Sequence, residues 1–168
     1  YLDMDTGIIY RKASLDDVPY IADIWNQGID SGNATFEIKK RDPVWTSDWL
    51  VKRDPRYVVL VAGNRNNILG WLSLNPFSSR EAYRFVADIS IYVENSYHGR
   101  GIGSGLLDHG IIEAKINGFH KLVLTMFRDN EIARKLYISR GFSTVGIMHE
   151  QGILNNKWID TEIMEKIL

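Results

Sequence analysis

A run of glycines near the middle of the chain constrains its fold more than any other feature. Residues 97–105 read Tyr-His-Gly-Arg-Gly-Ile-Gly-Ser-Gly and lie between a predicted strand and a predicted helix. Glycines let backbone N–H groups approach an anion closely, and the N-terminus of the following helix adds a favourable dipole. The stretch therefore predicts an α/β domain that holds a pyrophosphate in front of this helix.

Three kinds of phosphate-binding loop can be compared with this stretch. A Walker A loop requires Gly-Lys followed by Ser or Thr, and no such triplet occurs in the chain. A dinucleotide fingerprint requires G-x-G-x-x-G, and its last position is serine or leucine in the two possible registers. The pattern R/Q-x-x-G-x-G/A fits residues 98–103, except that His98 occupies the first position. A glycine-rich turn without a ligand is the alternative, and the strand and amphipathic helix that flank the loop argue against it.

The hydrophobic pattern predicts one α/β domain over residues 1–168, with residues 1–7 as a tail. Strands are predicted over residues 8–13, 57–62, 68–74, 82–93, 121–127, 142–148 and 158–167, and a turn over 63–67. Helices are predicted from the N-cap Ser14 to Trp25 and over 43–53, 102–116 and 130–140, with a loop over 26–41. We expect a mixed, largely antiparallel central sheet flanked by helices.

Composition excludes several classes of protein. Twenty basic and 21 acidic residues give a net charge of −1, which argues against a protein that coats nucleic acid. The absence of cysteine excludes thiolate metal sites and an acyl-cysteine intermediate, and the four histidines show no zinc-ligand spacing. No apolar stretch is long enough to cross a bilayer, and no signal peptide is visible. We therefore expect a cytoplasmic protein without a metal, a nucleic acid or a membrane as partner.

Three segments together resemble the GNAT acetyltransferase superfamily. They are the strand Asp-Ile-Ser-Ile-Tyr-Val at 88–93, the glycine loop, and the stretch from Asn130 through Leu136-Tyr137 to Gly141-Phe142. The sequence looks most like the phosphinothricin and methionine sulfoximine N-acetyltransferase branch, and the similarity runs from residues 9–13 to Met164. Residues 33–37 look like the substrate-side loop of that branch. His98 departs from the usual Arg or Gln, but backbone N–H groups hold most of the phosphate, so we expect binding to survive.

The resemblance implies a GNAT fold, acetyl-CoA as co-substrate, and transfer of an acetyl group to the amine of a small amino acid or analogue. Because the chain lacks cysteine, the amine is expected to attack directly in a ternary complex. The resemblance implies that the pantetheine arm pairs with Ile91, Tyr92 and Val93. It implies that the pyrophosphate lies against the loop residues Gly99, Arg100, Gly101, Ile102, Gly103 and Ser104. It also implies that Asn130 contacts the cofactor. It further implies a homodimer.

Asp88 and Tyr137 are the candidate catalytic residues. A carboxylate at Asp88 lies on the strand beside the proposed cofactor arm, where it could accept the amine proton directly or through water. The branch usually has Glu there, and the shorter Asp favours a water relay. In this superfamily a tyrosine at the position of Tyr137 often protonates the departing sulfur. The alternatives are a solvated strand residue for Asp88 and a packing aromatic for Tyr137.

Four residues are predicted to bind the acceptor, namely Phe36, Phe77, Arg80 and Tyr83. Together they suggest a closed pocket with aromatic walls, in which Arg80 binds a substrate carboxylate bidentately. Two other functions stay open. A protein N-terminal acetyltransferase would need an open groove instead, and a non-catalytic acetyl-CoA-binding module would not need Asp88 and Tyr137.

Overall fold

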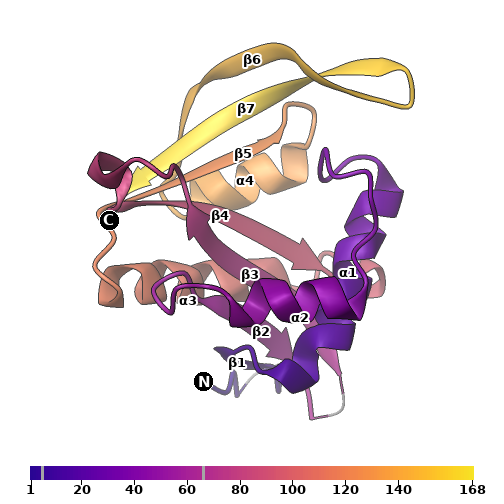
Figure 1. Cartoon of the computed structure of the whole chain (residues 1–168), viewed down its shortest axis with the longest axis vertical. Helices are drawn as coiled ribbons and strands as arrows, with labels where there is room; N and C mark the ends of the chain where they lie inside the picture. Colours follow the sequence, from indigo (N-terminus) through magenta and orange to yellow (C-terminus); the bar gives the residue numbers. More distant parts are fainter. Residues whose placement is uncertain (5, 66) are drawn as a thin grey trace.

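The sequence folds into a central sheet with helices on both faces (Figure 1). The computed structural model describes residues 1–4, 6–65 and 67–168. Its strands are β1 (Ile9–Lys12), β2 (Val59–Gly63), β3 (Ile68–Pro76), β4 (Val86–Val93), β5 (Lys121–Phe127), β6 (Ser143–Leu154) and β7 (Lys157–Ile167). Its α-helices are α1 (Val18–Ser31), α2 (Pro43–Val51), α3 (Ile102–Ile116) and α4 (Glu131–Ser139). In this described part, no helix has the length and apolar character needed to cross a membrane.

The strand order is β1-β2-β3-β4-β5-β7-β6, and β4 and β5 are the parallel neighbours in an otherwise antiparallel sheet. This confirms the predicted mixed, largely antiparallel α/β fold. β4 pairs with β5 only through residues 86–88 and 121–123. Beyond Asp88 the two strands diverge, and Figure 1 shows them as the arms of a V.

Alternation along the strands divides the core between the two faces of the sheet. Leu106 and Leu107 of α3 pack with Leu72 and Leu122 on one face. Ile21 and Trp25 of α1 pack with Trp71 on the other face. Fully burying one such aliphatic side chain contributes about 1.5–3 kcal/mol. The apolar stripe predicted for residues 102–116 is therefore the face that attaches α3 to the sheet.

The prediction that the chain becomes a loop at Asn26 is wrong. α1 continues to Ser31 and ends at Gly32, which has a φ of 67°. Gly28 lies inside the helix because the ring of Tyr92 packs directly against it, and a Cβ there would lie 2.9 Å from two ring atoms. A tertiary contact thus explains a glycine that the sequence pattern treats as a helix breaker.

Two strands have a bound that differs from the prediction by four residues or more, whereas the others differ by at most two. β4 begins at Val86, because residues 81–83 form a 3₁₀ turn. β6 continues past Met148 to Leu154 through an irregularity in its pairing with β7, where Glu150 has a φ of 48°. The hairpin closes at Asn155 and Asn156, whose φ values of 50° and 61° suit a tight two-residue turn.

The residues expected to form a tail run back along β1. Leu2 pairs with Ile9, and the amine of Tyr1 donates a hydrogen bond of 2.7 Å to the carbonyl of Tyr10. Asp5, in the same stretch, and Asn66, in the turn predicted over 63–67, lie outside the described residues.

Candidate active site

The divergence of β4 from β5 leaves one edge of β4 without a strand partner. β4 pairs with β3 along residues 87–93, but its pairing with β5 ends at Asp88. The backbone groups of Ile91 and the N–H of Val93 on the β5 side are therefore available to a bound molecule that carries amides of its own. This arrangement fits the pantetheine arm expected beside residues 91–93.

The glycine loop follows β4 and leads into the first turn of α3. Gly99 and Gly101 have φ values of 76° and 81°, a conformation that residues with a side chain rarely adopt. Gly101 is the N-cap of α3, and within the described part of the chain no side chain caps the N–H groups of the first turn. A Cβ at either glycine would project into open space. The loop therefore presents unsatisfied backbone donors, as an anion such as pyrophosphate requires.

The polar side chains of this loop leave its backbone donors accessible. An imidazole nitrogen of His98 lies 2.9 Å from the carbonyl oxygen of Val93, at the end of β4. The guanidinium of Arg100 lies 5.0 Å from the centre of the Tyr97 ring and is exposed. His98 therefore turns back to the strand, while Arg100 can add charge beside a phosphate.

Asp88 occupies the last paired position before the strands diverge. Ala87 and Ile89 belong to the core on the α3 side, so alternation directs Asp88 to the face covered by α1 and α2. Burial raises the pKa of Asp88 to about 6, and a hydrogen bond from the backbone N–H of Ile89 partly opposes this rise. Asp88 is half-buried rather than fully solvated. A carboxyl with a pKa near 6 is well matched to accept a proton at neutral pH.

Tyr137 approaches from the opposite face of the sheet. It lies on α4, is 8% exposed, and packs with its ring 5.6 Å from that of Phe142. Burial raises the pKa of Tyr137, and the charges of Tyr92 and Asp88 raise it further. Its phenol is therefore protonated at neutral pH, within electrostatic range of Asp88, and can serve as a proton donor.

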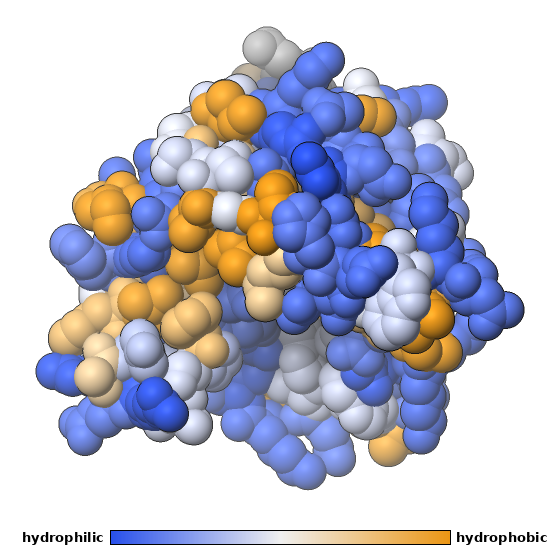
Figure 2. Space-filling model, turned by 90° about the horizontal axis from the view of Figure 1, so that it is seen from above, coloured by the Kyte–Doolittle hydropathy of each residue, from blue (hydrophilic) through white to orange (hydrophobic). Residues whose placement is uncertain are grey.

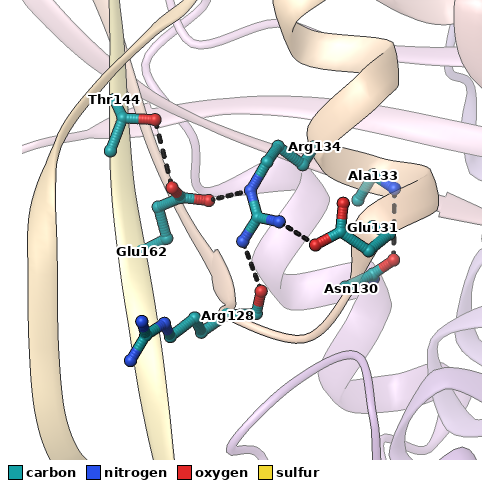
Figure 3. A network of polar contacts seen from close by, with 7 residues as sticks. All are labelled: Arg128, Asn130, Glu131, Ala133, Arg134, Thr144 and Glu162. Carbon is teal, nitrogen blue, oxygen red and sulfur yellow. Dashed lines mark hydrogen bonds and ion pairs between the residues drawn. The ribbon is translucent and has the colours of Figure 1, made fainter.

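Asn130 is the N-cap of α4. Its side-chain oxygen accepts a hydrogen bond of 3.1 Å from the backbone N–H of Ala133 (Figure 3). The residue predicted to contact the cofactor thus also stabilises the start of the helix that carries Tyr137.

A polar network attaches the start of α4 to the sheet (Figure 3). The Nε of Arg134 donates a hydrogen bond of 2.7 Å to Glu162, which is 5% exposed on β7. The same guanidinium pairs with Glu131 and with the carbonyl of Arg128. Thr144 of β6 donates a hydrogen bond of 3.1 Å to Glu162. These contacts join α4, β6 and β7 into one unit.

The four predicted acceptor residues fall into two places. The ring of Phe36 lies 4.8 Å from that of Phe127, at the end of β5. Phe77 and Tyr83 contact each other edge to face at 5.4 Å, in the connection between β3 and β4, where Arg80 is exposed. Phe36 thus lies at the open end of the V, whereas the other three precede β4 at its closed end.

Sequence reasoning missed a polar pair beside Asp88. Asn75 pairs with Asp88 across β3 and β4. The guanidinium of Arg53 donates a hydrogen bond of 2.9 Å to the side-chain oxygen of Asn75, whose amide donates one of 3.0 Å to Ser73. The alternation of polar and apolar residues along 72–76 is a sequence signal that Ser73 and Asn75 share one face of a strand. The position of Asn75 opposite Asp88 depends on the register of β3 with β4, which the sequence pattern does not specify.

Comparison with known proteins gives consistent matches. The chain is 27% identical over 156 residues to the L-methionine sulfoximine/L-methionine sulfone acetyltransferase of Salmonella typhimurium, covering 92% of this chain and 91% of that protein. It superimposes on the ribosomal-protein-alanine N-acetyltransferase of Brucella melitensis with a TM-score of 0.92 at 30% identity, covering 95% and 99%. The phosphinothricin acetyltransferase of Sinorhizobium meliloti, solved in complex with acetyl-CoA, gives a TM-score of 0.89 at 25% identity, covering 97% and 89%.

The family model described as the acetyltransferase (GNAT) family matches residues 22–142. This span includes the diverging strands, the glycine loop, Asp88 and Tyr137. The expectation from the sequence is confirmed, and the chain belongs to the GNAT family of acetyltransferases.

Proposed function

We propose that this protein transfers the acetyl group of acetyl-CoA to the amine of a small amino acid or analogue, of the methionine sulfoximine or phosphinothricin type. One observation carries the proposal, namely that Asp88, the proposed base, and Tyr137, the proposed acid, come from opposite faces of the sheet and lie within electrostatic range of each other. Burial raises the pKa of Asp88 to about 6, and Tyr137 stays protonated. The names of the similar proteins support the same class of acceptor.

We propose as cofactor-binding residues the ones that the sequence predicts. The first-turn N–H groups of α3, from Ile102 to Ser104, and the loop at 99–101 would hold the pyrophosphate. The unpaired edge of β4 would hold the pantetheine arm and polarise the thioester carbonyl. The bound thioester supplies the acetyl group to be transferred. The shape of the loop and the free donors fit this ligand.

In this proposal each proton has a donor and an acceptor on the chain. Asp88 accepts a proton from the attacking amine, directly or through one water, because its carboxylate lies on the face covered by α1 and α2. Tyr137 donates its phenolic proton to the sulfur that leaves. The chain has no cysteine, so the acetyl group passes to the amine without an acyl-cysteine.

Arg80 is proposed to bind the acceptor carboxylate. Among the described residues it has no ion-pair partner, and it is the N-cap of the turn that leads into β4. Phe77 and Tyr83 lie beside it and can contact the rest of the acceptor. A charge-assisted hydrogen bond to such a carboxylate contributes about 1.5–3 kcal/mol.

A homodimer is proposed from the surface of β6. This strand is an outer edge of the sheet, is 12 residues long, and exposes Val145, Met148 and Ile153. Figure 2 shows apolar side chains gathered among hydrophilic ones on the side of the molecule where β6 and β7 lie. An exposed apolar edge strand is a natural site for pairing. Sedimentation velocity on the wild type and on Val145→Glu tests this, and a wild type that is monomeric at micromolar concentration contradicts it.

Peptide N-termini are the second candidate acceptor, because the ribosomal-protein-alanine N-acetyltransferase shares the fold at 30% identity. The deciding experiment measures thiol release from acetyl-CoA with methionine sulfoximine, phosphinothricin, methionine sulfone, free amino acids and alanine-initiated tripeptides. Mass spectrometry identifies the acetylated product. We expect turnover with the amino acid analogues and little with the peptides. Turnover with peptides alone would establish the second candidate, and acetyl-CoA binding without any turnover would indicate a binding module.

A further inference from the structure

The connection between α1 and α2 crosses the open end of the V on the face of Asp88. The side chain of Thr35 faces the phenol of Tyr92, near the end of β4. The ring of its neighbour Phe36 lies 4.8 Å from the ring of Phe127, at the end of β5. Two consecutive residues thus reach both diverging strands, and the connection spans the opening between them.

The same connection is held in place independently of any ligand. The side-chain amide of Asn26 on α1 donates a hydrogen bond of 2.8 Å to the carbonyl of Arg41. Its side-chain oxygen accepts one of 2.7 Å from the backbone N–H of Arg41. Arg41 in turn binds Glu37 at 2.7 Å and stacks 4.0 Å from the centre of the Trp45 ring. These contacts fix the backbone that follows Phe36. They do not involve the Phe36 ring, whose position depends on the side chains and backbone that it contacts.

Gly152 of β6 lies directly against that ring. A Cβ at Gly152 would lie 2.5, 2.6 and 2.8 Å from three ring carbons of Phe36, well inside van der Waals contact. The irregularity of β6 places Gly152 there, and Asp160 fixes it by accepting a hydrogen bond of 2.8 Å from the backbone N–H of Glu150. The ring thus occupies a space that exists only because residue 152 has no side chain.

We propose that Gly152 is a specificity-determining residue, because its missing side chain forms the socket that holds Phe36 across the open end of the V. With Phe36 seated, the space beside Asp88 is closed at that end, which admits a short acceptor and excludes an extended peptide. This inference rests on the proposed function. It adds the residue that limits the length of the acceptor.

The test compares Gly152→Ala with Gly146→Ala in the same strand, where a Cβ would meet nothing within 4 Å. The added methyl displaces the Phe36 ring, so Gly152→Ala should raise KM for the preferred amino acid acceptor about tenfold. It should also raise the ratio of kcat/KM for an alanine-initiated tripeptide to that for the amino acid. The dissociation constant of acetyl-CoA, measured by calorimetry, should not change. Gly146→Ala should match the wild type in all three.

A double mutant separates the socket from a general effect on stability. In the Phe36→Ala background the clash is gone, so adding Gly152→Ala should have no further effect on KM or on the peptide ratio. Should Gly152→Ala not fold, Phe36→Ala alone must show the same loss of discrimination. The inference is overturned by additive effects, by parallel loss of acetyl-CoA affinity, or by a Gly152→Ala profile equal to that of Gly146→Ala. A wild type that acetylates no acceptor refutes the proposed function and the inference with it, whereas an active wild type with an unchanged variant refutes the inference alone.

Discussion

Burial, rather than a neighbouring charge, sets the proton affinity of Asp88. The carboxyl lies at the last paired position of β4, and burial is the main cause of a pKa near 6. An unperturbed aspartate, with a pKa of 3.8, would be a weaker base at neutral pH. The proposed chemistry of Asp88 therefore depends on which face of the sheet its side chain occupies, and alternation along β4 decides this.

Asp88→Asn should lower kcat by about 10²–10⁴-fold, because the amide cannot accept the amine proton. The dissociation constant of acetyl-CoA should stay the same, since the proposed phosphate donors lie on α3. Steady-state kinetics and calorimetry measure the two quantities, with Asp30→Asn, in an exposed ion pair with Lys40, as the control. Turnover near the wild-type value would show that Asp88 is structural.

The activity should fall as the pH drops through about 6. The base acts in its ionised form, and protonation of Asp88 at its pKa of about 6 removes that form. The profile of kcat/KM against pH should therefore have an acidic limb near pH 6, with a tenfold loss per unit below it. The residual activity of Asp88→Asn should lack this limb. A limb that persists in the variant would belong to another group.

The raised pKa of Asp88 also predicts how the stability of the fold changes with pH. The folded pKa of about 6 exceeds the unfolded value of 3.8, so the native state binds more protons than the unfolded state between these pH values. Asp88 therefore lowers stability as the pH rises through this window. Asp88→Asn should raise the melting temperature more at pH 8 than at pH 3.5. Equal shifts at both pH values would contradict a raised pKa.

At the scale of elements, the glycine loop and the start of α3 form one unit. Gly101 caps the helix in the left-handed conformation, with a φ of 81°. Gly101→Val should strain this conformation by about 1–3 kcal/mol and weaken acetyl-CoA binding about tenfold or more. Calorimetry measures the affinity. Gly118→Val is the control, because Gly118 follows the other end of α3 with a φ of 80° and its Cβ would also meet nothing within 4 Å among the described residues. Equal affinities for the two variants would contradict the role of the loop.

The whole molecule consists of two groups of strands that meet at the short parallel pairing of β4 with β5. β1 to β4 carry Asp88, and the unit of β5, β7 and β6 is joined to α4, which carries Tyr137. The distance between base and acid therefore depends on how α4 is attached to its own group of strands. Arg134 and Glu162 form that attachment.

Arg134→Met should lower the melting temperature, because it leaves the carboxylate of Glu162 buried without a cation. Arg140→Met, which breaks a more exposed ion pair with Asp108, should have a smaller effect. The double variant Arg134→Met/Glu162→Met should recover part of the loss, since no buried charge remains. Thermal unfolding measures all three, and equal shifts for Arg134→Met and Arg140→Met would contradict the importance of the buried pair.

Local patterns in the sequence were enough to predict the α/β class, the mixed sheet and the order of helices and strands. The spacing of apolar residues predicts the side of α3 that packs on the sheet. The run of glycines predicts a loop with positive φ values, which other residues rarely adopt. These features depend on residues within a few positions of one another, so the sequence alone predicts them. The resemblance of the sequence to a family indicates Asp88 and Tyr137 as candidate catalytic residues.

Only the tertiary structure decided how these parts act on one another. The burial that raises the pKa of Asp88, the extension of α1 past Gly28 beneath Tyr92, and the extra length of β6 all depend on packing between distant segments. The seating of Phe36 on Gly152 depends on the register of β6 with β7. A one-residue change of register moves every side chain to the other face of a sheet, and no local pattern specifies which register a pair of distant strands adopts.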